Sequence, residues 1–432
     1  MQEVCRRQIA HNVSLTCVRM RKFKTACLSI TLLTGLERET AAKSALLPSV
    51  LRRGTAIHPD MESLAAVMDG LYGVQIEPLV RKKGEIQCVG FRADFVDDDF
   101  VPAGANVLEN TAALLGEILL NPATRGGQLL GAYVDSEREN LINEIRATVN
   151  DKGVYAMRRL FEVMCPGERF ATMKLGTETG AKKITAAGLT KHYRNLVASA
   201  PIEIFYCGGA EPDRVEQALT GALSALPRRS GGGMPATQIR LQPVKDELRS
   251  YREALDVTQG KLTLGLRLGE TMTAPNVAVL RVLNTLYGGG VTSKLFRNVR
   301  ERLSLCYYAS SAVELNKGIM MVASGIEFGK YDEALAEILR QLEAVKSGDF
   351  TQDELQSAKS ELITSLQTVS DAQTRLEDYY LEQAISGLRC TPEELAALAD
   401  GVTREEIIRA AAGIRPDAVY FLTGKEAEPD AQ

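Results

Sequence analysis

Two side chains seven residues apart, Arg300 and Tyr307, offer the clearest chemistry in this sequence. They belong to segment 288–310, which opens on glycines that free the chain to turn. Apolar residues then recur at helical spacing, and from Leu305 onward they alternate as in a strand. A helix followed by a strand lets both side chains converge, and a guanidinium and a phenol donate hydrogen bonds to negative oxygen. The segment can therefore hold a peptide carbonyl, whereas such a pair in isolation would be a surface arginine beside a packed tyrosine.

The same segment resembles the C-terminal half of the pitrilysin/insulinase metallopeptidase family, which includes the mitochondrial processing peptidases. The family pattern there reads roughly Ser-x-Leu-Phe-x-x-x-Arg-x-x-x-x-Leu-x-Tyr, and this chain follows it from Ser293 to Tyr307. The resemblance implies that Arg300 and Tyr307 bind substrate and stabilise the developing oxyanion.

The zinc motif of that family is missing. Active members carry His-x-x-Glu-His on the first helix of the N-terminal half, ahead of a Gly-Thr. Alignment on Gly54-Thr55 places Ala45, Pro48 and Ser49 at these three positions. Catalytic zinc needs about three protein ligands, and alanine and proline offer no side-chain donor. The three histidines, His11, His58 and His192, are too far apart to form the motif elsewhere. We therefore expect no metal and no cofactor in this chain.

Two glutamates seven residues apart, Glu137 and Glu144, match the family's glutamate pair on a later helix, and the resemblance implies that Glu144 stands where the third zinc ligand is expected. Alone they cannot hold zinc tightly. One interpretation is an exposed, charged helix face with Leu141 and Ile145 turned inward. The other is a polar remnant in a disused cavity.

The chain repeats one order of elements. A strand at 26–33 and a helix at 39–52 correspond to a strand at 261–268 and a helix at 274–286; the other expected pairs are helices 104–121 and 125–150 with 331–347 and 352–385, and strands 202–208 with 418–424. The Gly- and Pro-rich stretch between the halves indicates a flexible connection. We predict an α+β fold with a homologous domain at 1–230, a linker at 231–245 and a second domain at 246–432. The resemblance implies mostly antiparallel sheets covered by helices, arranged as half of a clamshell.

Composition excludes some partners. The sequence holds 51 basic and 55 acidic residues, a net charge of −4, so we expect no nucleic-acid or anionic-membrane partner. The eight cysteines include no Cys-x-x-Cys pair, and no run of about 18 apolar residues occurs. Both observations favour reduced thiols and a cytoplasmic location.

Some weaker motifs have an ordinary structural explanation. The alternating stretch 85–96 fits a core strand, although an edge strand in this half of the family pairs with extended substrate. The run 97–99 of three aspartates fits a solvated turn better than a cation site. The glycines at 231–233 lack the Lys-Ser/Thr of a phosphate loop. His58 in a polar turn and His192 near a helix start fit ordinary surface histidines.

These observations lead to one functional hypothesis. The chain is predicted to be a zinc-less subunit, inactive alone, that lends Arg300 and Tyr307 to a homologous zinc-bearing partner acting on extended peptides. Family heterodimers of one metal-bearing and one metal-free chain provide the precedent. The alternative is a non-catalytic peptide-binding or scaffold protein, possibly a homodimer.

Overall fold

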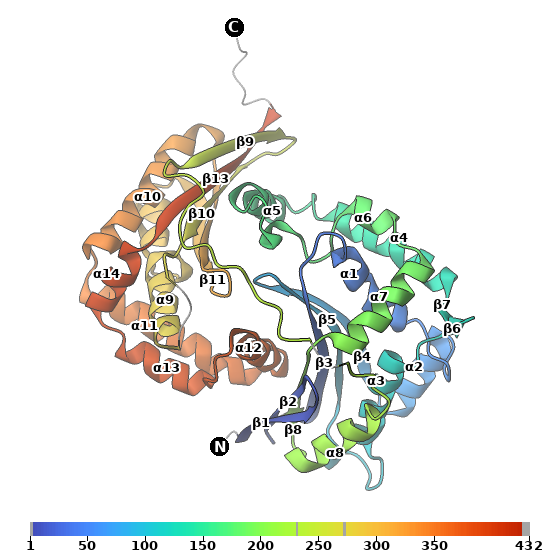
Figure 1. Cartoon of the computed structure of the whole chain (residues 1–432). Helices are drawn as coiled ribbons and strands as arrows, with labels where there is room; N and C mark the ends of the chain where they lie inside the picture. Colours follow the sequence, from blue (N-terminus) through green and yellow to red (C-terminus); the bar gives the residue numbers. More distant parts are fainter. Residues whose placement is uncertain (1–2, 230–231, 271–273, 426–432) are drawn as a thin grey trace. The chain divides into compact units, whose positions relative to one another are not determined.

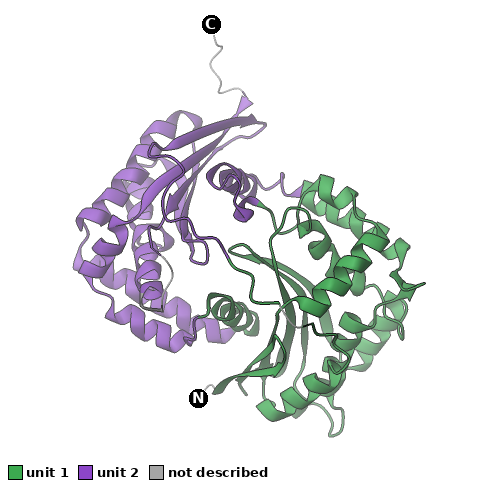
Figure 2. Ribbon diagram, in the orientation of Figure 1, with its two compact units in different colours: residues 1–146, 172–236, 372–387 green, residues 147–171, 237–371, 388–432 purple. Residues whose placement is uncertain are grey.

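The computed structural model describes residues 3–229, 232–270 and 274–425. Packing divides the chain into two compact units, which are coloured separately in Figure 2. Unit 1 comprises Met1–Arg146, Thr172–Ala236 and Ala372–Gly387. Unit 2 comprises Ala147–Ala171, Thr237–Asp371 and Leu388–Gln432. Neither unit is therefore a continuous piece of chain.

Unit 1 is built on a six-stranded sheet in the order β1-β2-β8-β3-β5-β4 (Figure 1). The pairing is antiparallel except between β2 and β8, which run parallel. The strands are β1 (Glu3–Ala10), β2 (Val13–Arg19), β3 (Thr25–Gly35), β4 (Gln75–Lys83), β5 (Ile86–Val96) and β8 (Ile202–Gly208). The stretch that we predicted as a core strand is β5, which lies between β3 and β4, so β4 and not β5 forms the edge.

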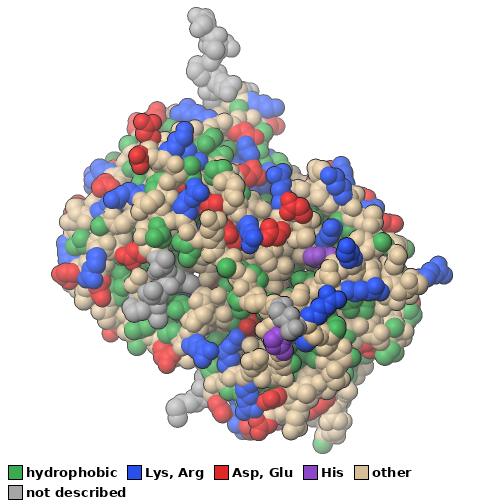
Figure 3. All heavy atoms as spheres, viewed as in Figure 1, with side chains coloured by type: hydrophobic (Ala, Val, Ile, Leu, Met, Phe, Trp, Pro, Cys, Tyr) green, Lys and Arg blue, Asp and Glu red, His purple; other side chains and the backbone are tan. Residues whose placement is uncertain are grey.

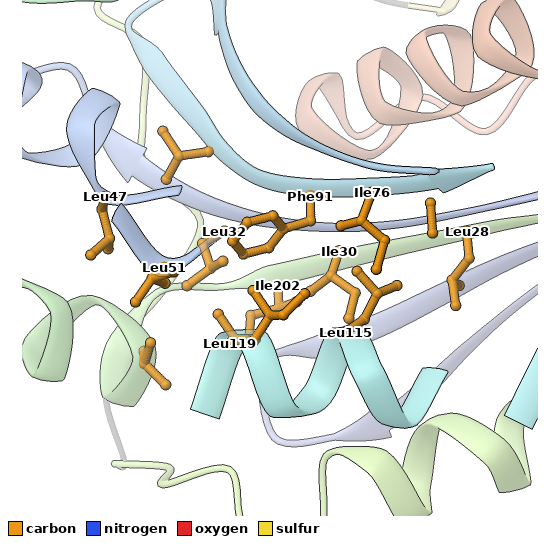
Figure 4. Close-up of a cluster of buried hydrophobic side chains, with 14 of the residues drawn as sticks. Leu28, Ile30, Leu32, Leu47, Leu51, Ile76, Phe91, Leu115, Leu119 and Ile202 are labelled. Carbon is orange, nitrogen blue, oxygen red and sulfur yellow. The ribbon is translucent and has the colours of Figure 1, made fainter. Parts of the chain in front are cut away.

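Helices cover this sheet and complete the core of unit 1. They are α1 (Ala41–Leu51), α2 (Met61–Gly70), α3 (Val107–Leu120), α4 (Gly131–Ala147), α6 (Glu178–Lys182), α7 (Ala186–Ser199), α8 (Pro212–Ala222) and α12 (Gln373–Ser386). A two-stranded hairpin, β6 (Thr124–Arg125) with β7 (Gln128–Leu129), precedes α4. Figure 4 shows leucines of α1 and α3 packing against alternate apolar residues of β3, such as Leu28 and Ile30.

Unit 2 is built on a five-stranded sheet in the order β11-β12-β10-β13-β9. Only β13 and β9 run parallel. The strands are β9 (Arg249–Leu255), β10 (Gly260–Arg267), β11 (Cys306–Glu314), β12 (Ile319–Ile326) and β13 (Arg415–Gly424). The helices are α5 (Lys152–Met164), α9 (Ala274–Asn284), α10 (Tyr331–Ser347), α11 (Gln352–Gln367), α13 (Pro392–Gly401) and α14 (Arg404–Ala412), with π-helical turns at Thr285–Gly289 and Phe296–Arg302.

The two sheets share one topology. Read from β4, the order β4-β5-β3-β8-β2 has the same sequence of antiparallel and parallel pairings as β11-β12-β10-β13-β9. Unit 1 adds β1 beyond β2. The predicted α+β fold with two homologous, mostly antiparallel domains is confirmed.

One helix of each half packs in the other unit. Helix α5 lies between α4 and α6 in the chain but belongs to unit 2, and α12 follows α11 but belongs to unit 1. The predicted single helix over 352–385 is wrong, because a 3-10 turn at Thr368–Asp371 separates α11 from α12. The helix expected over 125–150 begins only at Gly131, after the short hairpin.

The predicted linker contains one of the points where the chain passes from unit 1 to unit 2, between Ala236 and Thr237. Its first residue, 231, lies outside the described residues, and 232–248 has no regular secondary structure. On the face drawn in Figure 3, acidic and basic side chains are interspersed, in keeping with the nearly balanced charge.

Candidate functional site

The three degenerate motif positions lie on α1, a helix that is apolar on nearly all sides and therefore buried. Ala45 is 4% exposed and Pro48 is also buried, whereas Ser49 is half-buried. The helix is followed by Gly54, where a Cβ would collide with the carbonyl oxygen of Pro59. The Gly-Thr used for the alignment thus marks a tight turn that fixes where α1 ends.

A cavity of about 580 Å³ lies beside α1 within unit 1. Helix α1, the edge strand β4, strand β5 and helix α4 all contribute to its wall. The lining residues are Ala45, Leu46, Ser49, Pro78, Leu79, Val80, Arg81, Arg92, Glu137, Asn140, Leu141, Glu144, Lys174 and Leu175. The structure therefore brings two of the three motif positions and both predicted glutamates to one cavity.

The two glutamates have different surroundings. Glu137 accepts hydrogen bonds from Arg53 Nη1 at 3.2 Å and from Asn140 Nδ2 at 3.1 Å. The Arg53 guanidinium also lies 5.3 Å from the centre of the Tyr133 ring. Glu144 is exposed, one turn beyond the buried Leu141. Sequence reasoning missed Arg53 and Asn140, because neither belongs to a motif.

These residues do not fit a zinc ion. Ala45 and Pro48 supply no donor atom, and the Glu137 carboxylate is already paired with a guanidinium. Within 3–229, 232–270 and 274–425, no group of three or more His, Cys, Asp or Glu side chains could hold a metal. What the cavity offers is a wall that is mostly polar and charged, beside a strand edge.

The edge of β4 can accept another strand. In the sheet order, β4 has a neighbour on one side only. Pro78 pairs with Phe91 of β5, and since proline has no N–H, its nitrogen faces away from β5. Val80, two residues on, presents its N–H in the same outward direction. An extended peptide alongside β4 would thus find a donor at Val80 but none at Pro78.

A serine–histidine pair lies next to this cavity wall. Ser44 Oγ and His192 Nε2 are 2.9 Å apart. Burial, with a smaller contribution from Lys43, lowers the pKa of His192 to about 4. Ser44 is fully buried, so the pair joins α1 to α7 and cannot meet a substrate. The expectation of a surface histidine near a helix start is wrong, because His192 lies in the middle of α7 and is partly buried.

His58 is also used structurally. Its Nδ1 lies 2.9 Å from Glu117 Oε1, and the same carboxylate accepts a hydrogen bond from Thr55 Oγ1. The backbone N–H of His58 donates to Thr55 Oγ1 at 2.8 Å. These bonds hold the turn after α1 against α3, which agrees with the expected polar turn.

Two of the three consecutive aspartates accept hydrogen bonds from backbone N–H groups of other segments, while Asp99 is exposed. Asp98 accepts a hydrogen bond from the N–H of Val107 at 2.7 Å and forms an ion pair with Arg214 at 2.6 Å. Asp97 is buried and accepts from the N–H of Gly209 at 2.6 Å. The run therefore anchors the start of α3 and the end of β8 instead of forming a solvated turn.

Arg300 lies in unit 2, on the π-helical turn Phe296–Arg302. The wide turn is closed by bonds such as that from the N–H of Leu303 to the carbonyl of Asn298, 3.2 Å. The side chain is exposed, and its guanidinium carbon lies 4.7 Å from the centre of the Phe296 ring. The sequence identified Phe296 only as an apolar residue of the motif. The structure shows that its ring lies against the Arg300 guanidinium and supports it.

Tyr307 lies at the start of β11, the edge strand of its sheet. The register between β11 and β12 shifts between Cys306 and Tyr308, so Tyr307 is the extra residue of a β-bulge. Its side chain is 70% exposed. The predicted helix-to-strand transition is present, with both side chains exposed around it, and among the described residues no hydrogen bond joins Arg300 to Tyr307.

The sequence of this chain is similar to those of known proteins. A family profile described as "Peptidase M16 inactive domain" matches residues 183–362. A Bacillus subtilis (strain 168) protein named "Probable inactive metalloprotease YmfF" is 32% identical over 412 residues, which cover 95% of each chain.

No helix in the described part of the chain is long and apolar enough to cross a bilayer.

Solved structures give the same picture. A conserved protein from Enterococcus faecalis V583 superposes with a TM-score of 0.88 and 27% identity, covering 99% of this chain and 100% of that one. A peptidase M16 inactive domain from Pseudomonas fluorescens superposes with a TM-score of 0.79, covering 99% of each chain. At 16% identity, the second likeness shows the fold alone.

Proposed function

Because this chain belongs to the peptidase M16 family, the pitrilysin/insulinase family that its motifs resemble, we propose that it is a zinc-less subunit of a two-chain peptidase. In this proposal it binds extended peptide and contributes Arg300 and Tyr307 to a homologous subunit that carries the zinc motif. The partner's metal would supply the activated water. The chain alone would cleave nothing.

The loss of the zinc site supports the non-catalytic part of the proposal. Ala45, Pro48 and Ser49 leave neither ligand nor base on α1, and Arg53 occupies the Glu137 carboxylate. The relative from Bacillus subtilis is itself named a probable inactive metalloprotease. A partner must then provide all of the metal chemistry.

The observation that carries the proposal is the exposure of Tyr307. A tyrosine ring that is 70% exposed forgoes most of the stabilisation that burial would give. A bulge on an edge strand turns it outward, and Arg300 on the preceding turn is also exposed. Both side chains keep hydrogen-bond donors available for a substrate carbonyl and its oxyanion.

Reconstitution tests the proposal. The chain would be purified alone and with a homologue from the same genome that carries His-x-x-Glu-His, and zinc content and hydrolysis of an unfolded peptide would be measured. We expect stoichiometric zinc and hydrolysis only in the complex. Arg302→Ala, a change at an exposed arginine of the same π-helical turn, is the matched control for Arg300→Ala. Tight zinc in the isolated chain, or no association with any such homologue, would overturn the proposal.

A second candidate function is peptide binding without any catalytic partner, possibly as a homodimer. The observation that favours it is the cavity of about 580 Å³ along the unpaired edge of β4. A bound segment could add to β4 by main-chain hydrogen bonds while its side chains enter the cavity.

Val80→Pro tests this second function. The change removes the outward N–H of Val80 without breaking the ladder to β5, because Val80 follows Pro78 by two residues in the same strand. Val80→Ala keeps the donor and is the control. Peptide affinity of the isolated chain should fall for the proline variant only. Binding that survives Val80→Pro would place the peptide elsewhere.

A further inference from the structure

Unit 1 contains two pairs of cysteines that face each other across neighbouring strands. Cys5 of β1 is directly opposite Cys17 of β2, and Cys27 of β3 is directly opposite Cys207 of β8. Both strand pairs are antiparallel. All four thiols are free.

Direct opposition satisfies the main geometric requirement of a disulfide. Opposed residues of antiparallel strands have Cα atoms about 4.5–5.5 Å apart. Disulfides span Cα separations of about 4.4–6.8 Å. Either pair could therefore be bridged with only a small adjustment of the backbone. Register alone therefore permits two bridges.

The pairs lie on opposite faces of the sheet. Cys17 belongs to the main core of the unit, and Cys5 packs against that core. Ala26 and Tyr206 belong to the same core, so Cys27 and Cys207, the next residue on each strand, point to the other face.

The pairs also differ in access. Cys5 is only partly buried and belongs to β1, an edge strand held by a single neighbour. Cys27 and Cys207 are both fully buried on inner strands. Burial raises the pKa of Cys17 as well as those of Cys27 and Cys207, so the access of solvent to Cys5, and not thiol ionisation, distinguishes the two pairs.

Cys17 is placed to react with Cys5 and with little else. It is fully buried, and it lies directly opposite Cys5 on the neighbouring strand. An oxidant from solution can reach Cys5 first, and Cys17 then attacks from inside the sheet. Such an arrangement is typical of a reactive cysteine beside a resolving one.

We propose that Cys5 and Cys17 form a reversible oxidation site that closes a cross-strand disulfide and locks the edge strand β1 onto β2. With hydrogen peroxide as the oxidant, the Cys5 thiol gives a sulfenic acid and one water. The Cys17 sulfur then attacks the Cys5 sulfur, and the hydroxyl leaves with the Cys17 proton as a second water. Overall two thiols and one peroxide give one disulfide and two waters, and a dithiol reductant reverses the change.

Locking has a measurable consequence. The bridge would close the loop that contains the turn between β1 and β2, which restricts the unfolded and locally opened states. Amide hydrogens of β1 should therefore exchange more slowly in the oxidised protein, while those of β13 in unit 2 should not change.

Peptide mapping of the full chain tests the proposal. The protein would be treated with hydrogen peroxide, alkylated, and digested with trypsin without reduction. Trypsin separates Cys5 (peptide 1–6) from Cys17 (8–19), and Cys27 (25–38) from Cys207 (195–214). We expect the 1–6/8–19 cross-link as the first disulfide and no 25–38/195–214 cross-link. An equal or faster inner cross-link, an intermolecular Cys5 disulfide, or Cys5 sulfinic acid beside a free Cys17 would overturn the proposal.

Variants sharpen the test. Cys17→Ala should leave Cys5 as a sulfenic acid that dimedone traps, whereas Cys207→Ala should leave the Cys5–Cys17 cross-link unchanged. If Cys17→Ala fails to fold, the mapping of the unaltered chain still decides. Failure of the 1–6/8–19 cross-link would leave the peptidase-subunit proposal untouched, because the two rest on different residues.

Discussion

The edge strands β4 and β11 occupy the same position in two sheets of one topology, yet they present different chemistry. Beside β4 lies the cavity, which is lined by Ala45 and Ser49, two of the degenerate zinc-motif positions. At the start of β11 a bulge turns Tyr307 into solvent. The difference teaches that one duplicated scaffold can present different surface chemistry at equivalent edges. A few side chains and local irregularities, such as a bulge and a π-helical turn, set that chemistry.

The two helices that pack in the unit of the other half, α5 and α12, are held there by different ion pairs. On unit 1, α12 is attached through Glu377, which accepts a hydrogen bond from the partly exposed Arg81 at 2.5 Å. On unit 2, the segment after α5 is attached through Glu168, which pairs with Arg267 at 2.9 Å and Lys317 at 2.7 Å. Arg267 and Lys317 are fully buried, and Arg267 also pairs with the buried Asp417. Unit 2 therefore depends more on complete charge pairing.

Among the proposed variants, Glu168→Gln should cause the largest loss of unfolding free energy. The change leaves Lys317 and Arg267 buried with one carboxylate fewer, and breaking a buried pair in this way costs about 3–5 kcal/mol of unfolding free energy. Glu377→Gln should cost about 1–2 kcal/mol, because Arg81 reaches solvent. Urea unfolding of both variants, with a spectroscopic probe in each unit, measures the difference. Equal losses would contradict the contrast.

Arg300→Ala and Tyr307→Phe should each slow peptide hydrolysis by the proposed two-chain complex on the order of 100-fold, or about 3 kcal/mol, because each removes an oxyanion donor. Arg300→Lys should also be poor, since an ammonium does not reproduce the planar fork of a guanidinium. The measurement is kcat/KM in the reconstituted complex, with assembly checked separately. Variants that assemble normally and keep parental kcat/KM would show that β11, like β4, carries no catalytic function.

Protonation of His192 should destabilise unit 1 in mild acid. Its pKa falls to about 4 on folding from an ordinary value near 6.5, so the unfolded chain takes up the proton first as the pH drops. Stability is therefore lost between about pH 6.5 and 4, by roughly 2–3 kcal/mol. His192→Gln should flatten this part of the stability curve, and the same change at exposed His11 is the control. A curve unchanged by His192→Gln would show that another group causes the slope.

Hydrophobic periodicity was sufficient for the repeated fold. Alternation and helical spacing predicted β8 and α10 at their observed bounds. In the structure a capping box between Thr351 and Glu354 starts α11. The same periodicity could not assign α12 to unit 1. Residues 352–385 read as one helical stretch, and only tertiary contacts such as Arg81 with Glu377 show where its second part packs.

The candidate site was predictable in its residues but not in its surroundings. Family spacing pointed to Ala45, Ser49, Glu137 and Glu144 before their common cavity was visible. Nothing in the sequence indicated that Arg53 would pair with Glu137, since a contact across 84 positions leaves no local pattern. The bulge at Tyr307 is equally hidden, because the sequence predicted that Leu305, Tyr307 and Ala309 alternate as in a regular strand, whereas Leu305 and Ala309 are buried and Tyr307 is exposed.

Restoring the zinc motif should have the smallest effect of these changes, because it should create almost no peptidase activity. Ala45→His, Pro48→Glu and Ser49→His together supply the missing atoms, but not the positions that a metal requires. Ala45 is 4% exposed, so an imidazole there must displace packed neighbours.

In the triple variant Glu144, which matches the family's third ligand, would still be exposed on α4, and the accompanying Glu137 would still be held by Arg53 and Asn140. Catalytic geometry must be kept to within about 0.5 Å, which neighbours selected for another arrangement do not provide. We expect weak zinc binding by metal analysis and negligible peptide hydrolysis. Robust zinc-dependent cleavage by the triple variant alone would instead mean that the β4 cavity is still preorganised for metal, and that the contrast with β11 rests on three side chains only.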